Sequence, residues 1–155
     1  MQKRRNTKQV KAGNVLIGGG APVTVQSMLS VPSTDLAGSV RQAAALEEAG
    51  CQIVRAAIPN REAVALIPAI KERVRIPLVA DIHFDYKLAL EAAAAGVDKI
   101  RINPGNIGDD SRVKAVADAC RQRNIPIRVG VNSGSLEKHI LAKYGGPTAE
   151  ALCES

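Results

Sequence analysis

The stretch Ala95-Gly96-Val97-Asp98-Lys99-Ile100-Arg101 repeats the pattern of an earlier one, Ala49-Gly50-Cys51-Gln52-Ile53-Val54-Arg55, with Arg at the same place. In both, an Ala-rich run ends at Ala-Gly, where a glycine suits the left-handed residue that follows a helix, and a strand-like segment comes next. Between them, Ile76-Pro77-Leu78-Val79 introduces another strand, and Ile125-Pro126-Ile127-Arg128 echoes it. The repeat therefore predicts helix-to-strand units of regular length, in which an Ala-Gly turn and an Ile-Pro turn alternate before successive strands.

Strand and helix patterns alternate along the rest of the chain, which indicates a parallel sheet with right-handed crossovers. Strands are expected at 23–28, 52–58, 77–83, 99–103 and 127–132. Helices are expected near 34–49, 61–74, 85–95, 110–124 and 148–155. We expect an α/β fold, a parallel (β/α) TIM barrel that is incomplete at about five βα units. A five-stranded flavodoxin-like sheet is the alternative.

Several local signals refine this organisation. Gly13-Asn14 between short apolar runs predicts a hairpin turn, Asp85 is placed to cap a helix, and Pro68 predicts a kink or an early break in its helix. We therefore expect a basic tail and N-terminal hairpin over residues 1–22 and the partial barrel over residues 23–155.

Composition narrows the class of protein. The chain has 155 residues, 46% of them hydrophobic but only 2% aromatic, and a net charge of +6 to which the opening eight residues contribute as a solvated tail. Scarce aromatic residues argue against nucleic-acid binding. We expect no signal peptide and no membrane span, because no apolar run is long enough. The isolated Cys51, Cys120 and Cys153 predict reduced thiols in a cytoplasmic protein and no metal site in this chain.

Polar residues fall at alternate positions near the carboxyl ends of the expected strands. Because side chains on a strand alternate between faces, one set should face the covering helices: Val23, Val25, Val54, Ala56, Leu78, Ala80, Ile82, Ile100, Ile102, Ile127, Val129 and Val131. The opposite set should point into the barrel: Thr24, Gln26, Met28, Ile53, Arg55, Val79, Asp81, His83, Lys99, Arg101, Asn103, Arg128, Gly130 and Asn132. All five strands thus deliver polar groups to one interior, at the strand ends where α/β folds bind ligands.

Three arginines of this interior, Arg55, Arg101 and Arg128, face the single carboxylate of Asp81. Unpaired charges there are costly to bury, and guanidinium groups suit phosphate or carboxylate geometry. The surplus of positive charge therefore indicates an anionic ligand, and a diphosphate would use all three arginines. The alternative is an internal ion-pair network in which Asp81 neutralises one arginine and His83 is an ordinary core histidine.

Longer motifs carry a resemblance over nearly the whole chain. They are listed here in chain order: Gly13-Asn14-Val15, Val25-Gln26-Ser27-Met28, Ala45-Leu46-Glu47-Glu48-Ala49-Gly50, Ala80-Asp81-Ile82-His83-Phe84-Asp85-Tyr86, Arg101-Ile102-Asn103-Pro104-Gly105-Asn106-Ile107-Gly108 and Gly130-Val131-Asn132-Ser133-Gly134-Ser135-Leu136-Glu137-Lys138. Together they resemble the 4-hydroxy-3-methylbut-2-enyl diphosphate synthase family of the methylerythritol phosphate isoprenoid pathway. The resemblance implies an N-terminal TIM barrel, a C-terminal domain with a [4Fe-4S] cluster, and reductive ring opening of 2-C-methyl-D-erythritol 2,4-cyclodiphosphate with flavodoxin or ferredoxin as electron donor.

The resemblance implies roles for individual residues when the family's motif positions are matched to this sequence. Arg55, Arg101 and Arg128 match the family's diphosphate-binding arginines. The polar residues expected around the same pocket are Asp81, His83, Asn103 and Asn132. Since the chemistry of the family takes place at the iron, these residues are expected to hold the substrate. His83 with Asp81 is a catalytic candidate only as a proton donor.

Two departures limit what the resemblance implies. After Ser27-Met28 the family has a Thr-Asn-Thr-like loop, whereas this chain has Leu29-Ser30-Val31-Pro32-Ser33-Thr34-Asp35, which puts loop contacts there in doubt. Five strands are expected where a barrel has eight, and no cluster-binding cysteine motif occurs, so we expect a partial chain that is inactive by itself. The intact protein is expected to be a homodimer. The alternatives are a dihydropteroate synthase-like anion-binding barrel and a non-enzymatic fragment.

Overall fold

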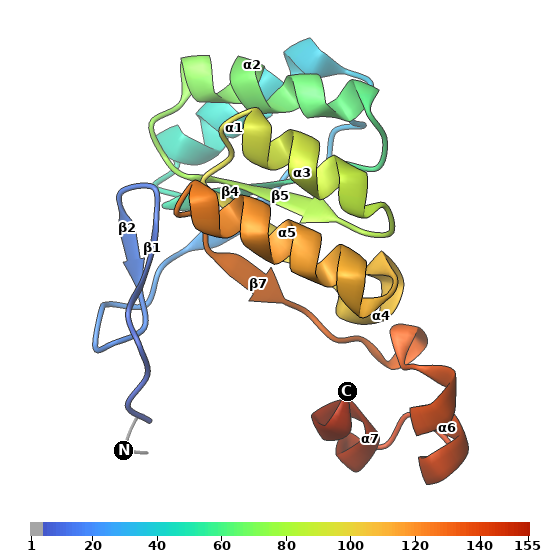
Figure 1. The fold of residues 1–155 in the computed structure, drawn as a ribbon. Helices are drawn as coiled ribbons and strands as arrows, with labels where there is room; N and C mark the ends of the chain where they lie inside the picture. Colours follow the sequence, from blue (N-terminus) through green and yellow to red (C-terminus); the bar gives the residue numbers. More distant parts are fainter. Residues whose placement is uncertain (1–4) are drawn as a thin grey trace.

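Five parallel strands in sequential order organise the chain (Figure 1). The computed structural model describes residues 5–155. The strands are β3 (Gln26–Met28), β4 (Ile53–Ala57), β5 (Leu78–Ile82), β6 (Lys99–Ile102) and β7 (Ile127–Val129). Each strand pairs with the next one along the chain, and β3 and β7 are the edges. This order is that of a TIM-barrel wall and excludes the flavodoxin-like alternative, in which the strand order reverses.

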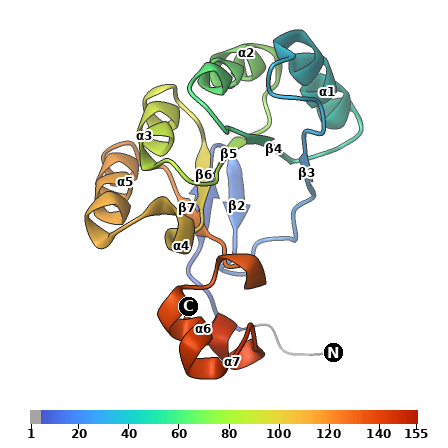
Figure 2. The same cartoon turned by 90° about the vertical axis from the view of Figure 1, so that its right-hand side faces the viewer.

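Helices cover one face of this sheet, as an outer arc in Figure 2. They are α1 (Leu36–Glu48), the 3₁₀ turn η1 (Glu62–Ala65), α2 (Leu66–Arg73), α3 (Tyr86–Ala94) and α5 (Asp110–Gln122). The core lies between the two layers, where Val54, Leu78, Ile82 and Ile100 are fully buried. The apolar parity predicted for β4, β5 and β6 is therefore confirmed.

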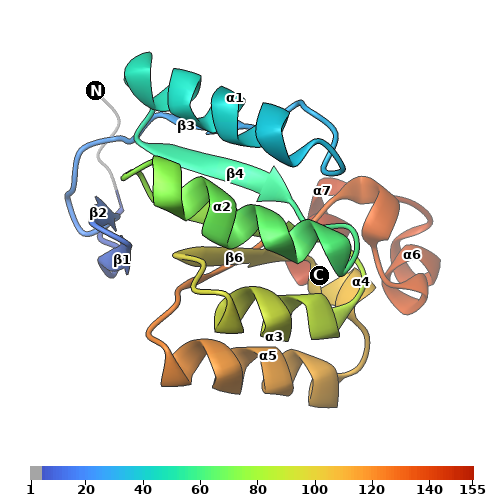
Figure 3. The same ribbon diagram turned by 90° about the horizontal axis from the view of Figure 1, so that it is seen from above.

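The expected hairpin is present as β1 (Val10–Ala12) and β2 (Val15–Ile17), joined through Gly13 at φ +55°. A Cβ on Gly13 would lie 2.9 Å from Cγ of Pro77, so the turn packs closely against the segment that enters β5. Figure 3 shows the hairpin at one end of the sheet and α4, α6 and α7 at the other. Residues 1–4 of the expected basic tail lie outside the described residues.

The predicted helix signals are confirmed. The carboxylate of Asp85 accepts a hydrogen bond from the backbone N–H of Lys87 and caps α3. Gly50 and Gly96 have positive φ angles of 89° and 86°, as expected after helices. The segment containing Pro68 is split into η1 and α2, which begins two residues before the proline. A proline so near the start of a helix costs little, because the first N–H groups have no partner inside the helix.

The C-terminal part contains elements that were not predicted. Besides the expected α7 (Ala149–Glu154), these are α4 (Pro104–Ile107), the 3₁₀ turn η2 (Ser133–Ser135) and α6 (Lys138–Tyr144). Leu136, Ile140 and Ala151 form a second, small core between α6 and α7, separate from the main one.

Three valines were assigned wrongly to the helix-covered core. Val23 and Val25 are 74% and 61% exposed, because β3 begins only at Gln26 and the chain before it does not lie under a helix. Val129, at the edge of the sheet, is 61% exposed. Alternation on a strand predicts which face a residue is on, but not whether that face is covered.

Candidate functional site

The face of the sheet opposite the helices carries the polar residues predicted for the barrel interior. Adjacent strands bring Ala57, Asp81, Arg101 and Arg128 into one row, because each is paired in register with the next. This row crosses β4 to β7 close to their carboxyl ends. The register therefore places the charges from separate strands side by side.

Asp81 is the centre of this row and is only 1% exposed. Its Oδ2 lies 2.8 Å from Nη2 of Arg55 and accepts a hydrogen bond from Nε at 3.0 Å. Its Oδ1 accepts from Nη1 of Arg101 at 3.1 Å. Nε2 of His83, immediately after β5, lies 3.3 Å from Oδ2. Both carboxylate oxygens are thus engaged by side chains from β4, β6 and the end of β5.

The electrostatics of Asp81 follow from these neighbours. Burial by itself raises the pKa of the carboxyl group. Arg55, the hydrogen bond from His83 and Arg101 act in the opposite direction and outweigh burial, so the pKa lies below its ordinary value of 3.8. The carboxylate is therefore charged at neutral pH, and it orients two guanidinium groups at the mouth of the site.

His83 and Phe84 form the rim of the site above Asp81. The His83 side chain is 43% exposed, so one side of the ring is open to solvent while Nε2 faces the carboxylate. The Phe84 ring stands edge-on to it, with centroids 6.1 Å apart and planes at 85°. A histidine held between a carboxylate and solvent is able to donate or accept a proton at this position.

Arg101 lies across the backbone of the neighbouring segment. A Cβ on Gly130, directly after β7, would be 2.7 Å from both Nε and Nη2 of Arg101. Only glycine leaves this space for the guanidinium group in its present position. The sequence signal for this contact was an isolated glycine at a strand end, which commonly marks a close approach.

Lys99 joins the same face without having been counted among the candidate site residues. It is half-buried on β6, two residues before Arg101. Burial, with a smaller contribution from Arg128, lowers the pKa of its amine. The alternation of β6 places Lys99 in the interior, so the sequence contained the signal for a fourth cation on this face.

Asn103 and Asn132 lie in the loops after β6 and β7. Asn103 is 2% exposed; its Oδ1 accepts from the N–H of Gly105 and caps α4, while its Nδ2 donates to Oγ of Ser135. Ser135 in turn donates to the backbone oxygen of Asn132 at 3.2 Å. Asn103 thus ties two loops together, and the side chain of Asn132 is exposed.

The structure therefore gathers the predicted site residues into two groups. The carboxylate of Asp81 contacts Arg55, His83 and Arg101, and Arg128 is paired in register with Arg101. Asn103 and Asn132 belong to the neighbouring loop pair. Ser135, which links that pair, was not predicted, because a serine in a loop has no periodic signal.

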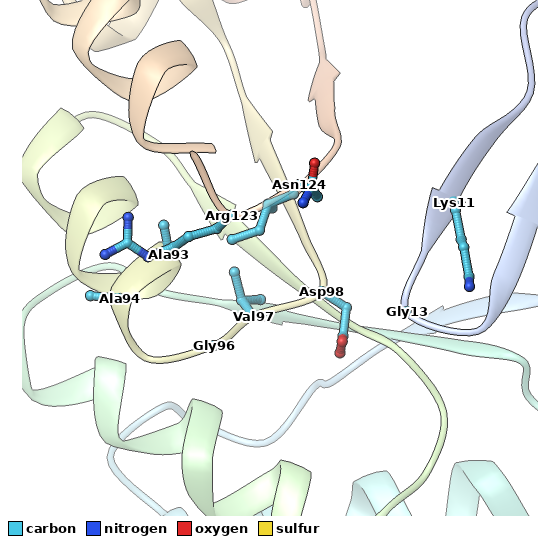
Figure 4. A pocket seen from close by; sticks show the side chains of 10 residues that line it. Lys11, Gly13, Ala93, Ala94, Gly96, Val97, Asp98, Arg123 and Asn124 are labelled. Atoms are coloured by element: carbon cyan, nitrogen blue, oxygen red, sulfur yellow. The ribbon is translucent and has the colours of Figure 1, made fainter. Parts of the chain in front are cut away.

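A cavity of about 560 Å³ lies at the other end of the sheet (Figure 4). It is bordered by Lys11 of the hairpin, by Asp98 before β6, and by Arg123 and Asn124 before β7. Because Asp98, Arg123 and Asn124 precede their strands, the cavity lies at the amino ends of β6 and β7. It is thus distinct from the polar site.

The described residues do not fit an iron–sulfur cluster or another bound metal. Within residues 5–155, no three His, Cys, Asp or Glu side chains gather closely enough to hold a metal ion. Cys51 and Cys120 are buried, and Cys51 Sγ donates to the backbone oxygen of Ile53.

With this geometry in place, comparison with known proteins identifies the family. The GcpE TIM-barrel domain matches residues 7–155. The chain belongs to the GcpE family. Its TIM-barrel assignment agrees with the sequential parallel strands and their helical cover.

Three curated relatives with high identity to the chain share one name. The chain is 56% identical over 153 residues to 4-hydroxy-3-methylbut-2-en-1-yl diphosphate synthase (flavodoxin) of Ruminiclostridium cellulolyticum, with 99% of this chain and 43% of the relative covered. It is 57% identical to the protein of the same name from Listeria monocytogenes serotype 4b and 56% identical to that from Pseudomonas aeruginosa, covering 98% of this chain and 41% of each relative. The chain thus spans about two-fifths of their length.

Solved structures share the fold at low identity. Dihydropteroate synthase of Yersinia pestis has a TM-score of 0.62 at 15% identity, covering 94% of this chain and 57% of that one. The Xanthomonas albilineans dihydropteroate synthase has a TM-score of 0.58 at 16% identity, over 87% of this chain and 54% of that one. At this identity the likeness concerns the fold alone. Among residues 5–155, no helix is long and apolar enough to cross a bilayer.

Proposed function

We propose that this chain is the substrate-binding barrel part of a 4-hydroxy-3-methylbut-2-enyl diphosphate synthase. The substrate in this proposal is 2-C-methyl-D-erythritol 2,4-cyclodiphosphate, which the whole enzyme opens reductively in isoprenoid biosynthesis. The proposed substrate-binding residues are those of the polar face and its adjoining loops: Arg55, Asp81, His83, Arg101, Asn103, Arg128 and Asn132.

The observation that carries the proposal is the charge of the polar face. Arg55, Lys99, Arg101 and Arg128 stand on neighbouring strands around one buried carboxylate, Asp81. A single carboxylate leaves this face positive, and a diphosphate supplies the missing negative charge at several oxygens. Cations oriented in advance also stabilise charge on a leaving diphosphate oxygen.

His83 is the candidate proton donor within this proposal. Its contact with Asp81 holds the ring, and its open side faces solvent where a substrate oxygen would lie. We expect His83→Asn to lower turnover of the whole enzyme more strongly than it weakens substrate binding. An equal loss of both would assign His83 to binding.

Cofactor, partners and location belong to the same proposal. A [4Fe-4S] cluster would supply the electrons for ring opening, and in this proposal its ligands come from a part of the whole enzyme that this chain does not contain. Flavodoxin is the proposed donor, on the strength of the relatives' names, with ferredoxin as the other candidate. A homodimer and a cytoplasmic location are proposed, the latter supported by three free cysteines.

Calorimetric titration with the cyclodiphosphate tests the binding role. We expect the chain to bind it and Arg101→Met to weaken binding about ten-fold or more, because a charge-assisted hydrogen bond is lost. The matched control is Arg121→Met on the exposed side of α5, where affinity should stay within about two-fold. Equal affinities for wild type and Arg101→Met would contradict the proposal, and binding of a pterin without the cyclodiphosphate would favour the dihydropteroate synthase-like alternative.

A further inference from the structure

The four cations of the polar face are not equally neutralised. Arg55 and Arg101 both contact the carboxylate of Asp81, at 2.8 Å and 3.1 Å. Within residues 5–155, no carboxylate lies at ion-pair distance from Lys99 or Arg128. The excess positive charge therefore belongs to the β6–β7 side of the site.

Strand register places these two residues next to each other. Arg128 pairs with Arg101, and Lys99 lies two positions before Arg101 on the same face of β6. They are thus diagonal neighbours on adjacent strands, close enough for the charge of Arg128 to act on the amine of Lys99. Their like charges repel. Burial and, to a smaller extent, this repulsion from Arg128 lower the pKa of Lys99.

The surroundings differ at the two cations. Arg128 is exposed, whereas Lys99 is half-buried beside the fully buried Val79, its partner in register on β5. An anion that enters from solvent would meet Arg128 first and Lys99 deeper in the site. Arg101, whose guanidinium lies over Gly130, borders the same space with donors that Asp81 does not use.

We propose that Lys99 is an anion-binding residue and that Lys99 and Arg128, with the donors of Arg101 that Asp81 does not use, together hold one phosphate group of the ligand. This inference rests on the proposed function, because it names where the diphosphate of that substrate docks. It adds one residue, Lys99, to the proposed binding site.

Inorganic pyrophosphate is the probe for this pair. Calorimetric titration of the 155-residue chain should show binding that Lys99→Met weakens about ten-fold, since one charge-assisted contact is removed. Lys99→Arg, which keeps the charge, should retain affinity within about three-fold of wild type. Lys114→Met removes an equal charge on the exposed face of α5, paired there with Asp118, and is the matched control.

Chemical labelling of the unsubstituted chain gives a second readout that does not depend on the folding of a variant. Acetic anhydride at neutral pH should acetylate Lys99, and pyrophosphate should protect it, with the site identified by mass spectrometry. Lys114 should be acetylated equally with and without pyrophosphate.

The outcomes separate the two proposals. If pyrophosphate binds the wild-type chain but Lys99→Met leaves affinity unchanged and labelling of Lys99 is not suppressed, Lys99 is no ligand and the proposed function stands. If neither pyrophosphate nor the cyclodiphosphate binds the wild-type chain, both proposals fail.

Discussion

At the scale of single residues, Asp81 is the group on which the others depend. It is buried with both oxygens occupied, and its partners come from three places in the chain. Burial of a carboxylate is tolerable only while these cations stay with it. The contacts that stabilise the buried Asp81 also orient Arg55 and Arg101. Asp81 therefore contributes both to the stability of the fold and to the geometry of the proposed binding site.

Replacing this carboxylate tests its structural role. Asp81→Asn leaves Arg55 and Arg101 partly buried without a counter-charge, and we expect a loss of about 3 kcal/mol in the free energy of unfolding. Urea denaturation at neutral pH measures it. Asp118→Asn, on an exposed pair, is the control and should change little. Equal effects of both substitutions would show that the buried cluster does not stabilise the fold.

Acidification should remove the same contribution. The folded-state pKa of Asp81 is below 3.8, so its stabilising effect is fully present above pH 3.8 and is lost as the pH falls through the folded-state value. We therefore expect the stability difference between wild type and Asp81→Asn to be constant from neutral pH down to about pH 4 and to shrink below it. Denaturation midpoints measured across this range check the sign, and a difference that grew on acidification would contradict it.

At the scale of elements, the sequence signals worked where strands are covered on both sides. The parity of β5 was correct at Leu78, Asp81 and Ile82, because both neighbours and the helical layer impose it. Burial was predicted wrongly at Val23 and Val129, near the two edges, because whether a face is covered depends on contacts that periodicity does not encode. The local signal for α4 was present, as Asn103 before a proline is a favourable cap, but a four-residue helix leaves no periodic pattern.

The segment after β7 offers a test at this scale. Gly130→Ala would place a Cβ 2.7 Å from the Arg101 guanidinium and displace it from Asp81. We expect a loss of about 1 kcal/mol in the free energy of unfolding, measured by urea denaturation. Gly134→Ala, with open space around its Cβ, is the matched control and should be neutral. If Gly130→Ala and Gly134→Ala had the same free energy of unfolding, Arg101 would have room to move away from the added Cβ.

The two loops after β6 and β7, which Asn103 and Ser135 link, offer a second test at this scale. Asn103→Ala removes the cap of α4 and the contact to Ser135, and we expect it to cost about 1 kcal/mol. Because Asn103 and Ser135 share a hydrogen bond, a double-mutant cycle with Ser135→Ala should give a coupling energy of at least about 0.5 kcal/mol. Strict additivity in denaturation experiments would refute the coupling.

At the scale of the whole molecule, two cores coexist. The main one joins the sheet to α1, α2, α3 and α5, whereas Leu136, Ile140 and Ala151 hold α6 and α7 together. The proposed division into residues 1–22 and 23–155 does not coincide with this separation and stays a prediction.

The small core should open more readily than the large one. Few buried residues hold it, supported by Glu154, which accepts from Nζ of Lys143 and from the hydroxyl of Tyr144, both at 2.6 Å. We expect amide hydrogens of α6 and α7 to exchange faster than those of β5 in native-state hydrogen exchange. Glu154→Gln should accelerate exchange in α6 without affecting β5. Uniform protection over both regions would show a single cooperative unit.

The sequential strand order has a consequence for how the site forms. Asp81 meets Arg55 and Arg101 across only 26 and 20 residues of chain, one βα unit to either side. Such contacts need only short loops to close, and loop closure is fast when few residues intervene. The charged centre of Asp81, Arg55 and Arg101 therefore needs only β4, β5 and β6 to form, and it does not depend on β7, η2, α6 or α7.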